Sequence, residues 1–123
     1  MLPAKNRLRR SADFSTVVRS GARARRGSVV LHLHHGLAVP ITGPASEQSA
    51  LEAPKVGLIV GKSVGNSVIR HQVSRRLRAQ LAARVPRLPL GSYTVVRALP
   101  ASAASSSQEL GSDLDAAIAK VLR

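Results

Sequence analysis

The strongest pattern along this chain is a helical repeat of apolar residues between positions 67 and 84. The apolar positions recur at every fourth residue, namely Ile69, Val73, Leu77 and Leu81. At roughly 100° per residue, this spacing places all of them on one face of an α-helix. Asn66 and Ser67 offer side-chain oxygens to the free N–H groups of a helix start, and Gly65 lets the chain turn there. The pattern predicts an amphipathic helix that begins near Ser67 and packs on a core.

Shorter runs on both sides of this helix predict the strands of a sheet. Residues 28–34 alternate between two faces, with Val29, Leu31 and Leu33 on one and Val30, His32 and His34 on the other. Residues 56–60 form an apolar run that suits a buried central strand leading into the helix. Residues 93–98 predict a further strand, which Pro100 ends. The basic segment 23–26 is either a loop or a short strand at the entrance to the sheet.

Two more helices are predicted from their start signals. Ser11 is expected to cap a short helix that ends at Gly21. One side of this helix carries Phe14, Val17 and Val18. Ser106 and Glu109 form a capping box for a last helix, which we expect to cover the sheet. Its apolar positions are Leu110, Leu114, Ile118 and Val121.

The segment 36–54 interrupts this pattern. It holds three of the seven prolines together with Glu47 and Glu52 amid Gly, Ser and Ala, which is typical of a long mobile hairpin loop. Pro86 and Pro89 close the basic helix. With 123 residues and no internal repeat, residues 1–123 are predicted to form one domain.

Charge narrows the class of partner. The chain has 19 Lys and Arg against 6 Asp and Glu, a formal net charge of +13, which is typical of nucleic-acid-binding proteins. It has no cysteine, which excludes disulfides and thiolate zinc sites and fits a reducing compartment. No stretch approaches the roughly 20 apolar residues of a membrane span, and the basic start lacks the apolar run of a signal peptide. We expect a soluble, cytoplasmic protein without a membrane partner.

The charge is concentrated on the predicted helix, opposite its apolar face. His71, Arg75 and Arg78 fall about 150° from the centre of that face. The flanks of this surface carry Arg70, Ser74 and Arg76. Residues 55–91 contain no Asp or Glu, whereas an ordinary solvated helix mixes signs and gains i,i+4 pairs. A polyanion-binding surface is therefore the preferred interpretation over a merely solvated face.

Signs of covalent chemistry are missing from the sequence. The acids are scattered and read as structural, and no pair of carboxylates or nucleophile with its base stands in the basic half. Gly61-Lys62-Ser63 lacks the earlier glycine of a phosphate loop, because position 56 is Val. His32, His34 and His35 raise a metal hypothesis, but separate ligand elements with Cys or carboxylates are absent nearby, so a polar strand face that touches RNA is preferred.

Phe14 and Tyr93 are the two aromatic residues, which argues against single-strand binding by several stacked rings. The pattern alone favours a core position for Phe14.

Three places give the chain a resemblance to a known family. They are Asn6-Arg7-Leu8 with Asp13-Phe14, the segment from Val56 to Val68, and the arginine-rich helix through Arg78. In these places the chain resembles the protein subunit of bacterial ribonuclease P, and the likeness covers nearly the whole sequence. The family's helix pattern of Arg-Asn-Arg, then Arg and Arg at three-residue steps, reads here as Arg70-His71-Gln72, Arg75 and Arg78. Ser63 and Ser74 also replace common lysines.

The resemblance implies an α+β sandwich with a central, mostly antiparallel sheet and the basic helix in a left-handed βαβ crossover between parallel strands. It implies a catalytic RNA that cleaves the 5′ leader from precursor tRNA with Mg²⁺, while the protein alone is inactive and holds no catalytic residue or metal. The implied RNA-binding residues are Arg7, Lys62, Asn66, Arg70, His71, Gln72, Arg75, Arg76 and Arg78. The implied leader-binding cleft is lined by Phe14, Val18 and Leu31, which shifts Phe14 toward a ligand-facing role.

Other classes of function remain open. The same charge would serve another small basic RNA-binding protein, such as a ribosomal one, which would show no preference for precursor tRNA. A helix-based DNA-binding regulator is disfavoured by the sheet-rich pattern, so no DNA partner is expected. A metal-dependent nuclease acting alone is disfavoured further by the missing carboxylates.

Overall fold

The computed structural model describes residues 6–34 and 53–122. Four strands form one mixed sheet in the order β1-β2-β4-β3. Their bounds are Ala22–Arg26 for β1, Val29–His34 for β2, Lys55–Ile59 for β3 and Tyr93–Ala98 for β4. β1 with β2 and β2 with β4 are antiparallel, and β3 with β4 is parallel. The mostly antiparallel sheet expected from the family resemblance is confirmed, and the basic segment before Gly27 is a strand.

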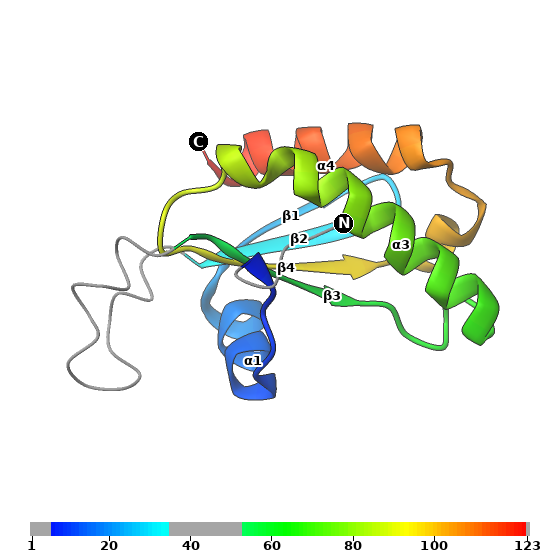
Figure 1. Ribbon diagram of the computed structural model, residues 1–123, viewed down its shortest axis with the longest axis horizontal. Helices are drawn as coiled ribbons and strands as arrows, with labels where there is room; N and C mark the ends of the chain where they lie inside the picture. The colour runs from blue at the N-terminus through cyan, green and yellow to red at the C-terminus, as the bar shows by residue number, and fades with distance from the viewer. Residues whose placement is uncertain (1–5, 35–52, 123) are drawn as a thin grey trace.

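Three α-helices cover the two faces of this sheet (Figure 1). α1 (Ser11–Ser20) lies on one face, and α3 (Ser67–Arg84) and α4 (Ser107–Val121) lie on the other. Short 3-10 helices follow α3 and β4, at Val85–Arg87 (η3) and Pro100–Ala104 (η4). None of the helices in the described ranges is long and apolar enough to span a membrane.

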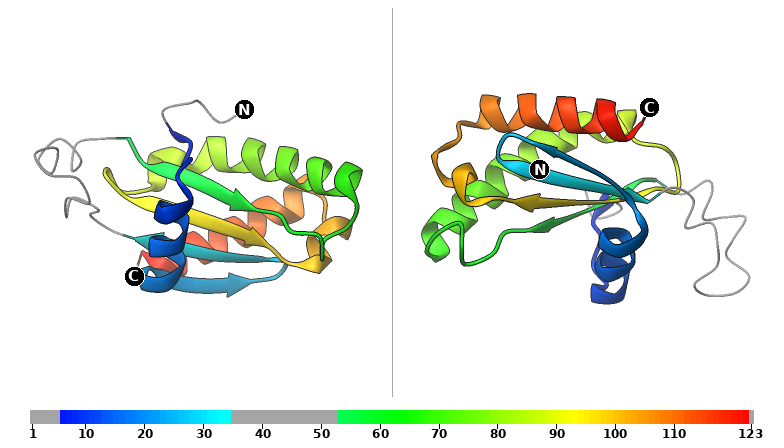
Figure 2. Two further views of the ribbon diagram at one scale, coloured as in Figure 1. Left: turned by 90° about the horizontal axis from the view of Figure 1, so that it is seen from below. Right: turned by 180° about the vertical axis from the view of Figure 1, so that it is seen from behind.

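The connection from β3 through α3 to β4 has an unusual hand. In the left panel of Figure 2 both strands point to the right, the chain passes behind the sheet as α3, and it returns one strand lower as β4. This is a left-handed crossover, whereas about 98% of such connections are right-handed. The crossover implied by the family resemblance is therefore present.

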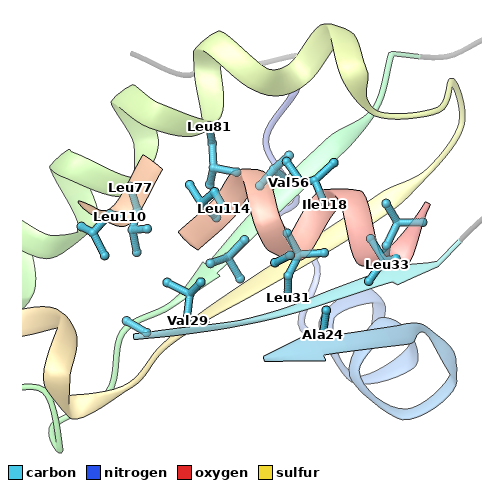
Figure 3. Packing of buried hydrophobic residues seen from close by; sticks show 14 of the residues in the cluster. Ala24, Val29, Leu31, Leu33, Val56, Leu77, Leu81, Leu110, Leu114 and Ile118 are labelled. Carbon is cyan, nitrogen blue, oxygen red and sulfur yellow. The ribbon is translucent and has the colours of Figure 1, made fainter. Parts of the chain in front are cut away.

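The main core lies between the sheet and the pair α3 and α4, as Figure 3 shows. The apolar face of α4 is fully or almost fully buried there, with Leu110, Leu114, Ile118 and Val121. The predicted capping box is present, since Glu109 N–H donates to Ser106 Oγ at 3.1 Å and Ser106 N–H donates to Glu109 Oε1 at 2.8 Å. α4 covers β1 and β2, as the sequence predicts.

One predicted position in the sheet is wrong. β3 is an edge strand and not the central strand that its apolar run suggested. The run is apolar because helices cover both faces of the strand: Val56 belongs to the core under α3, and Ile59 packs on the side of α1. The edge itself is bordered by the start of the chain, where Leu8 N–H donates to the Val56 carbonyl at 2.9 Å and Asn6 Nδ2 donates to the Pro54 carbonyl at 2.8 Å.

α1 begins one residue away from the predicted cap. Arg10 takes the N-cap position without a side-chain hydrogen bond, and Ser11 is the first helical residue. Pairing of residues 7 and 8 with β3 fixes where the chain turns into the helix. The predicted end at Gly21 is confirmed, and a Cβ there would stand 2.6 Å from the Val17 carbonyl oxygen, so no larger residue fits. The predicted loop 36–54 falls almost wholly outside the described residues.

Candidate nucleic-acid interface

α3 orients its two faces as its sequence pattern predicts. Asn66 is the N-cap, and its side-chain oxygen accepts a hydrogen bond of 3.0 Å from the backbone N–H of Ile69. Val73, Leu77 and Leu81 are fully buried in the core, and Ile69 packs at its border. Because this face is fixed on the core, the opposite face of α3 is open to solvent.

The open face of α3 and the turn before it carry most of the residues expected to contact RNA. The exposed ones are Lys62, Asn66, His71, Gln72, Arg75 and Arg78, and we call Lys62, His71, Arg75 and Arg78 the basic strip. In residues 6–34 and 53–122, the ion pairs join Asp115 to Arg84 and Arg87, and none involves the basic strip. Its positive charge is therefore available to a phosphate backbone.

Arg76 and Arg70 differ from the basic strip. Arg76 is half-buried, and its guanidinium donates to the Ser105 carbonyl at 3.1 Å, which ties α3 to η4. Arg70 is also half-buried, and its Nε is enclosed without a hydrogen-bond partner among the described residues. Arg76 therefore has a bond within the fold, so its charge is not free in the way that of Arg75 is.

The carboxylates of α4 also make bonds within the fold. Glu109 closes the capping box. Asp113 accepts from the backbone N–H and the hydroxyl of Ser28, each at 3.1 Å, and so holds the turn between β1 and β2. Asp115 accepts from Arg84 Nε at 2.7 Å, and this hydrogen bond lowers the pKa of Asp115. The structural interpretation of these three acids is therefore confirmed.

Phe14 lies where α1, β3 and the start of the chain meet. Its half-buried ring rests on the backbone of Gly57, where any Cβ would overlap the ring. A hollow of about 320 Å³ opens beside it. The hollow is lined by Arg7, Leu8, Arg9, Phe14, Val56, Gly57, Leu58 and Arg78. An aromatic ring and an apolar floor thus lie beside three arginines, one of which belongs to the basic strip.

Val18 lies on the other side of Phe14. It is 37% exposed on α1 and lines a second, shallow hollow with Phe14, Ser15 and Arg19. The structure therefore brings Phe14 and Val18 together, and it also brings Arg7 and Arg78 to Phe14. The sequence pattern gave no reason to include Arg9 or Gly57, because their nearness to Phe14 depends on how the first residues run along β3.

Leu31 is not part of this surface. Its side chain is fully buried in the core between the sheet and α4, on the opposite face of the sheet from Phe14. Successive side chains of a strand point to opposite faces, so the residue of β2 that faces α1 is His32, which pairs with Val95 beneath α1. The assignment of Leu31 to the cleft is wrong by one residue.

His32 is almost fully buried, with 6% of its surface exposed, and its Nδ1 has no hydrogen-bond partner among the described residues. Burial lowers the pKa of His32, and the neighbouring charges of Arg23 and Arg97 lower it further. His32 and His34 do share one face, but the described residues hold no group of three His, Cys, Asp or Glu side chains that could bind a metal ion. His35 lies outside the described residues.

Comparison with known proteins places this geometry in a family. The family model described as Ribonuclease P matches residues 2–122. The ribonuclease P protein component of Salinispora tropica is 48% identical over 126 residues, which cover 97% of this chain and 92% of that protein. The ribonuclease P protein component of Streptomyces bikiniensis is 44% identical, covering 99% and 96% of the two chains.

Solved structures show the same fold at lower identity. The ribonuclease P protein of Staphylococcus aureus superposes with a TM-score of 0.74 at 19% identity, covering 96% of this chain and 98% of the other. That of Thermotoga maritima gives 0.68 at 17% identity, covering 89% and 92%. Both the full-length family match and the identity to its members lead to one conclusion: this chain belongs to the family of ribonuclease P protein components, and its partner is the RNA of that enzyme.

Proposed function

We propose that this chain binds the catalytic RNA of ribonuclease P through the basic strip, and the 5′ leader of precursor tRNA through the hollow beside Phe14. The observation that carries the proposal is the position of Arg78. It belongs to the exposed face of α3 and also lines the hollow with Phe14. A single strand that leaves the catalytic RNA along α3 would therefore enter the hollow directly.

The hollow suits a single-stranded nucleotide. A base stacked on an aromatic ring gains about 1–3 kcal/mol, and Phe14 offers a partly exposed ring for this contact. Arg9 and Arg78 lie close enough to neutralise the phosphates on either side of the base. Gly57 supplies a floor without a side chain, which leaves the ring in place and the hollow open.

We assign the chemistry of leader removal to the RNA and not to this chain. The three carboxylates of α4 hold the fold, and Asp13 is buried under α1, so these acids do not form a pair that could hold the Mg²⁺ ions needed by the reaction. The Mg²⁺ ions would be bound by the RNA. The protein would act in the cytoplasm, where bacterial precursor tRNA is made.

The division of labour is tested with nuclease-free protein and precursor tRNA in Mg²⁺. We expect no cleavage by the protein alone and leader removal after addition of the RNA subunit. Cleavage by protein that had been treated with RNase and repurified would contradict this assignment.

The leader site is tested by Phe14→Ala in the reconstituted holoenzyme. The dissociation constants for precursor and mature tRNA are measured at one salt and Mg²⁺ concentration. We expect the preference for the precursor to fall by much of the stacking contribution of about 1–3 kcal/mol. Equal weakening of both affinities, with the loss of several kcal/mol of folding stability typical of an emptied core site, would show that Phe14 is ordinary core.

A further inference from the structure

The part of the sheet that α1 leaves uncovered is strongly basic. Figure 2 (left) shows α1 crossing the strands near the ends where β3 and β4 begin. Among the described helices, none lies over the other half of this face, toward the ends of β3 and β4. We call the residues of this half that point to the side of α1 the open sheet face. They are Arg23, Arg25, Val30, His32, Ile59 and Arg97.

Strand register sets these side chains in two rows across the sheet. Arg25 pairs with Val30, Val30 with Arg97, and Arg97 with Ile59. The next row runs from Arg23 through His32 and Val95 to Gly57, on which the Phe14 ring rests. Because neighbouring strands lie about 4.8 Å apart, the rows span roughly 14 Å from β3 to β1.

The charges on the open sheet face are exposed and unopposed by its own strands. Arg23, Arg25 and Arg97 are all exposed. β1, β2, β3 and β4 contain no Asp or Glu at all. Between the arginines lies His32, which is almost fully buried and has an Nδ1 that no described residue hydrogen-bonds. Arginines around an unpartnered imidazole suit a ligand with both phosphates and hydroxyl or base edges, which describes RNA.

We infer that the open sheet face continues the path of the precursor's 5′ leader, so that the strand runs beside α1 from the hollow at Phe14 across β4 and β2 to Arg23 and Arg25 on β1. The inference rests on the proposed function. The direction follows from the position of Arg78, which joins the basic strip to the hollow at the β3 edge. Nucleotides close to the cleavage site therefore meet Phe14, and nucleotides farther upstream meet Arg97 and then Arg25.

The test uses the reconstituted holoenzyme and precursor tRNAs with leaders of increasing length. Arg25→Ala combined with Arg97→Ala is expected to weaken binding of the longest leader on the order of tenfold, and to leave mature tRNA and the shortest leader unchanged. For the longest leader, the magnitude of the slope of log K against log salt should fall by about 0.7 for each phosphate that the variant no longer neutralises. Arg25→Lys with Arg97→Lys should restore most of the affinity.

Arg26→Ala is the matched control. Arg26 is on the same strand as Arg25 but on the opposite face, and its guanidinium donates to the Arg25 carbonyl at 3.3 Å, so the substitution removes one charge without touching the open sheet face. We expect this variant to bind all leaders like the unaltered protein. Thermal unfolding of each variant, and its affinity for the catalytic RNA alone, are measured in parallel.

The outcomes separate the two proposals. If the unaltered holoenzyme prefers precursor tRNA but the double variant loses affinity equally for every leader length, or for the catalytic RNA alone, the inference is overturned and the proposed function stands. If the unaltered holoenzyme has no preference for precursor over mature tRNA, the proposed function fails and the inference fails with it.

Discussion

The ring of Phe14 lies so close to the backbone of Gly57 that no side chain fits between them. α1 and β3 thus meet through an aromatic ring on a bare strand. This contact fixes the height of the ring above the sheet and so determines the shape of the hollow beside it.

Gly57→Ala is therefore expected to displace the Phe14 ring and to lower the preference for precursor tRNA. The loss should be a large part of the stacking contribution of about 1–3 kcal/mol. Gly61→Ala is the matched control, because a Cβ at Gly61 meets nothing within 4 Å. The pair of dissociation constants for precursor and mature tRNA measures the effect, and an unchanged preference in Gly57→Ala would separate the ring position from leader binding.

Arg75→Ala and Arg78→Ala should weaken binding to the catalytic RNA and reduce the magnitude of its salt slope by about one unit each. Both side chains are exposed, so the melting temperature should hardly change. Leu77→Ala, one position before Arg78, should instead cost about 2–5 kcal/mol of folding stability, because Leu77 is fully buried. Salt titrations and thermal unfolding of the three variants distinguish the two faces of α3.

A new aromatic residue on β2 should act in opposite ways at two adjacent positions. Leu31→Tyr places a larger, polar ring in the packed core and should destabilise the fold by about 1–3 kcal/mol. His32→Tyr places the ring on the side of α1, and we expect it to strengthen the preference for precursor tRNA. A stable Leu31→Tyr protein with raised precursor affinity would contradict the assignment of the two faces.

The lowered pKa of His32 predicts a pH dependence of stability. Below the ordinary histidine pKa of 6.5, the unfolded chain binds a proton that folded His32 does not, so stability should fall as the pH decreases from 6.5 toward the folded pKa. His32→Gln should remove this part of the pH dependence. Urea unfolding of both proteins across this range measures it, and parallel curves would mean that His32 is protonated equally in both states.

Much of the fold followed from local sequence, and the errors have specific physical causes. The fourfold spacing of α3 and the Ser106 capping box are local signals, and both were confirmed. The apolar run of β3 reports that both faces are covered, but says nothing about which strands pair with it, so its edge position was missed. Hydrophobicity does not encode strand order.

The site was predicted less completely, because its parts meet only in three dimensions. Leu31 and His32 are adjacent in sequence, yet one is in the core and the other faces α1, so an error of one residue changes the face. Arg76 looks like part of the basic strip by angle alone, but the Ser105 carbonyl that it bonds lies 29 residues away. Arg97 joins the open sheet face only through the register of β4.

The position of β4 between β2 and β3 also sets the order in which the protein can fold. β2 and β3 are not neighbours, so until residues 93–98 have been synthesised only the hairpin of β1 and β2 can pair. α3 leaves the ribosome before β4 does, with its apolar face still lacking most of the core on which it packs. A chain that stops short of Tyr93 would therefore carry its whole basic helix and still have no surface on which to hold it.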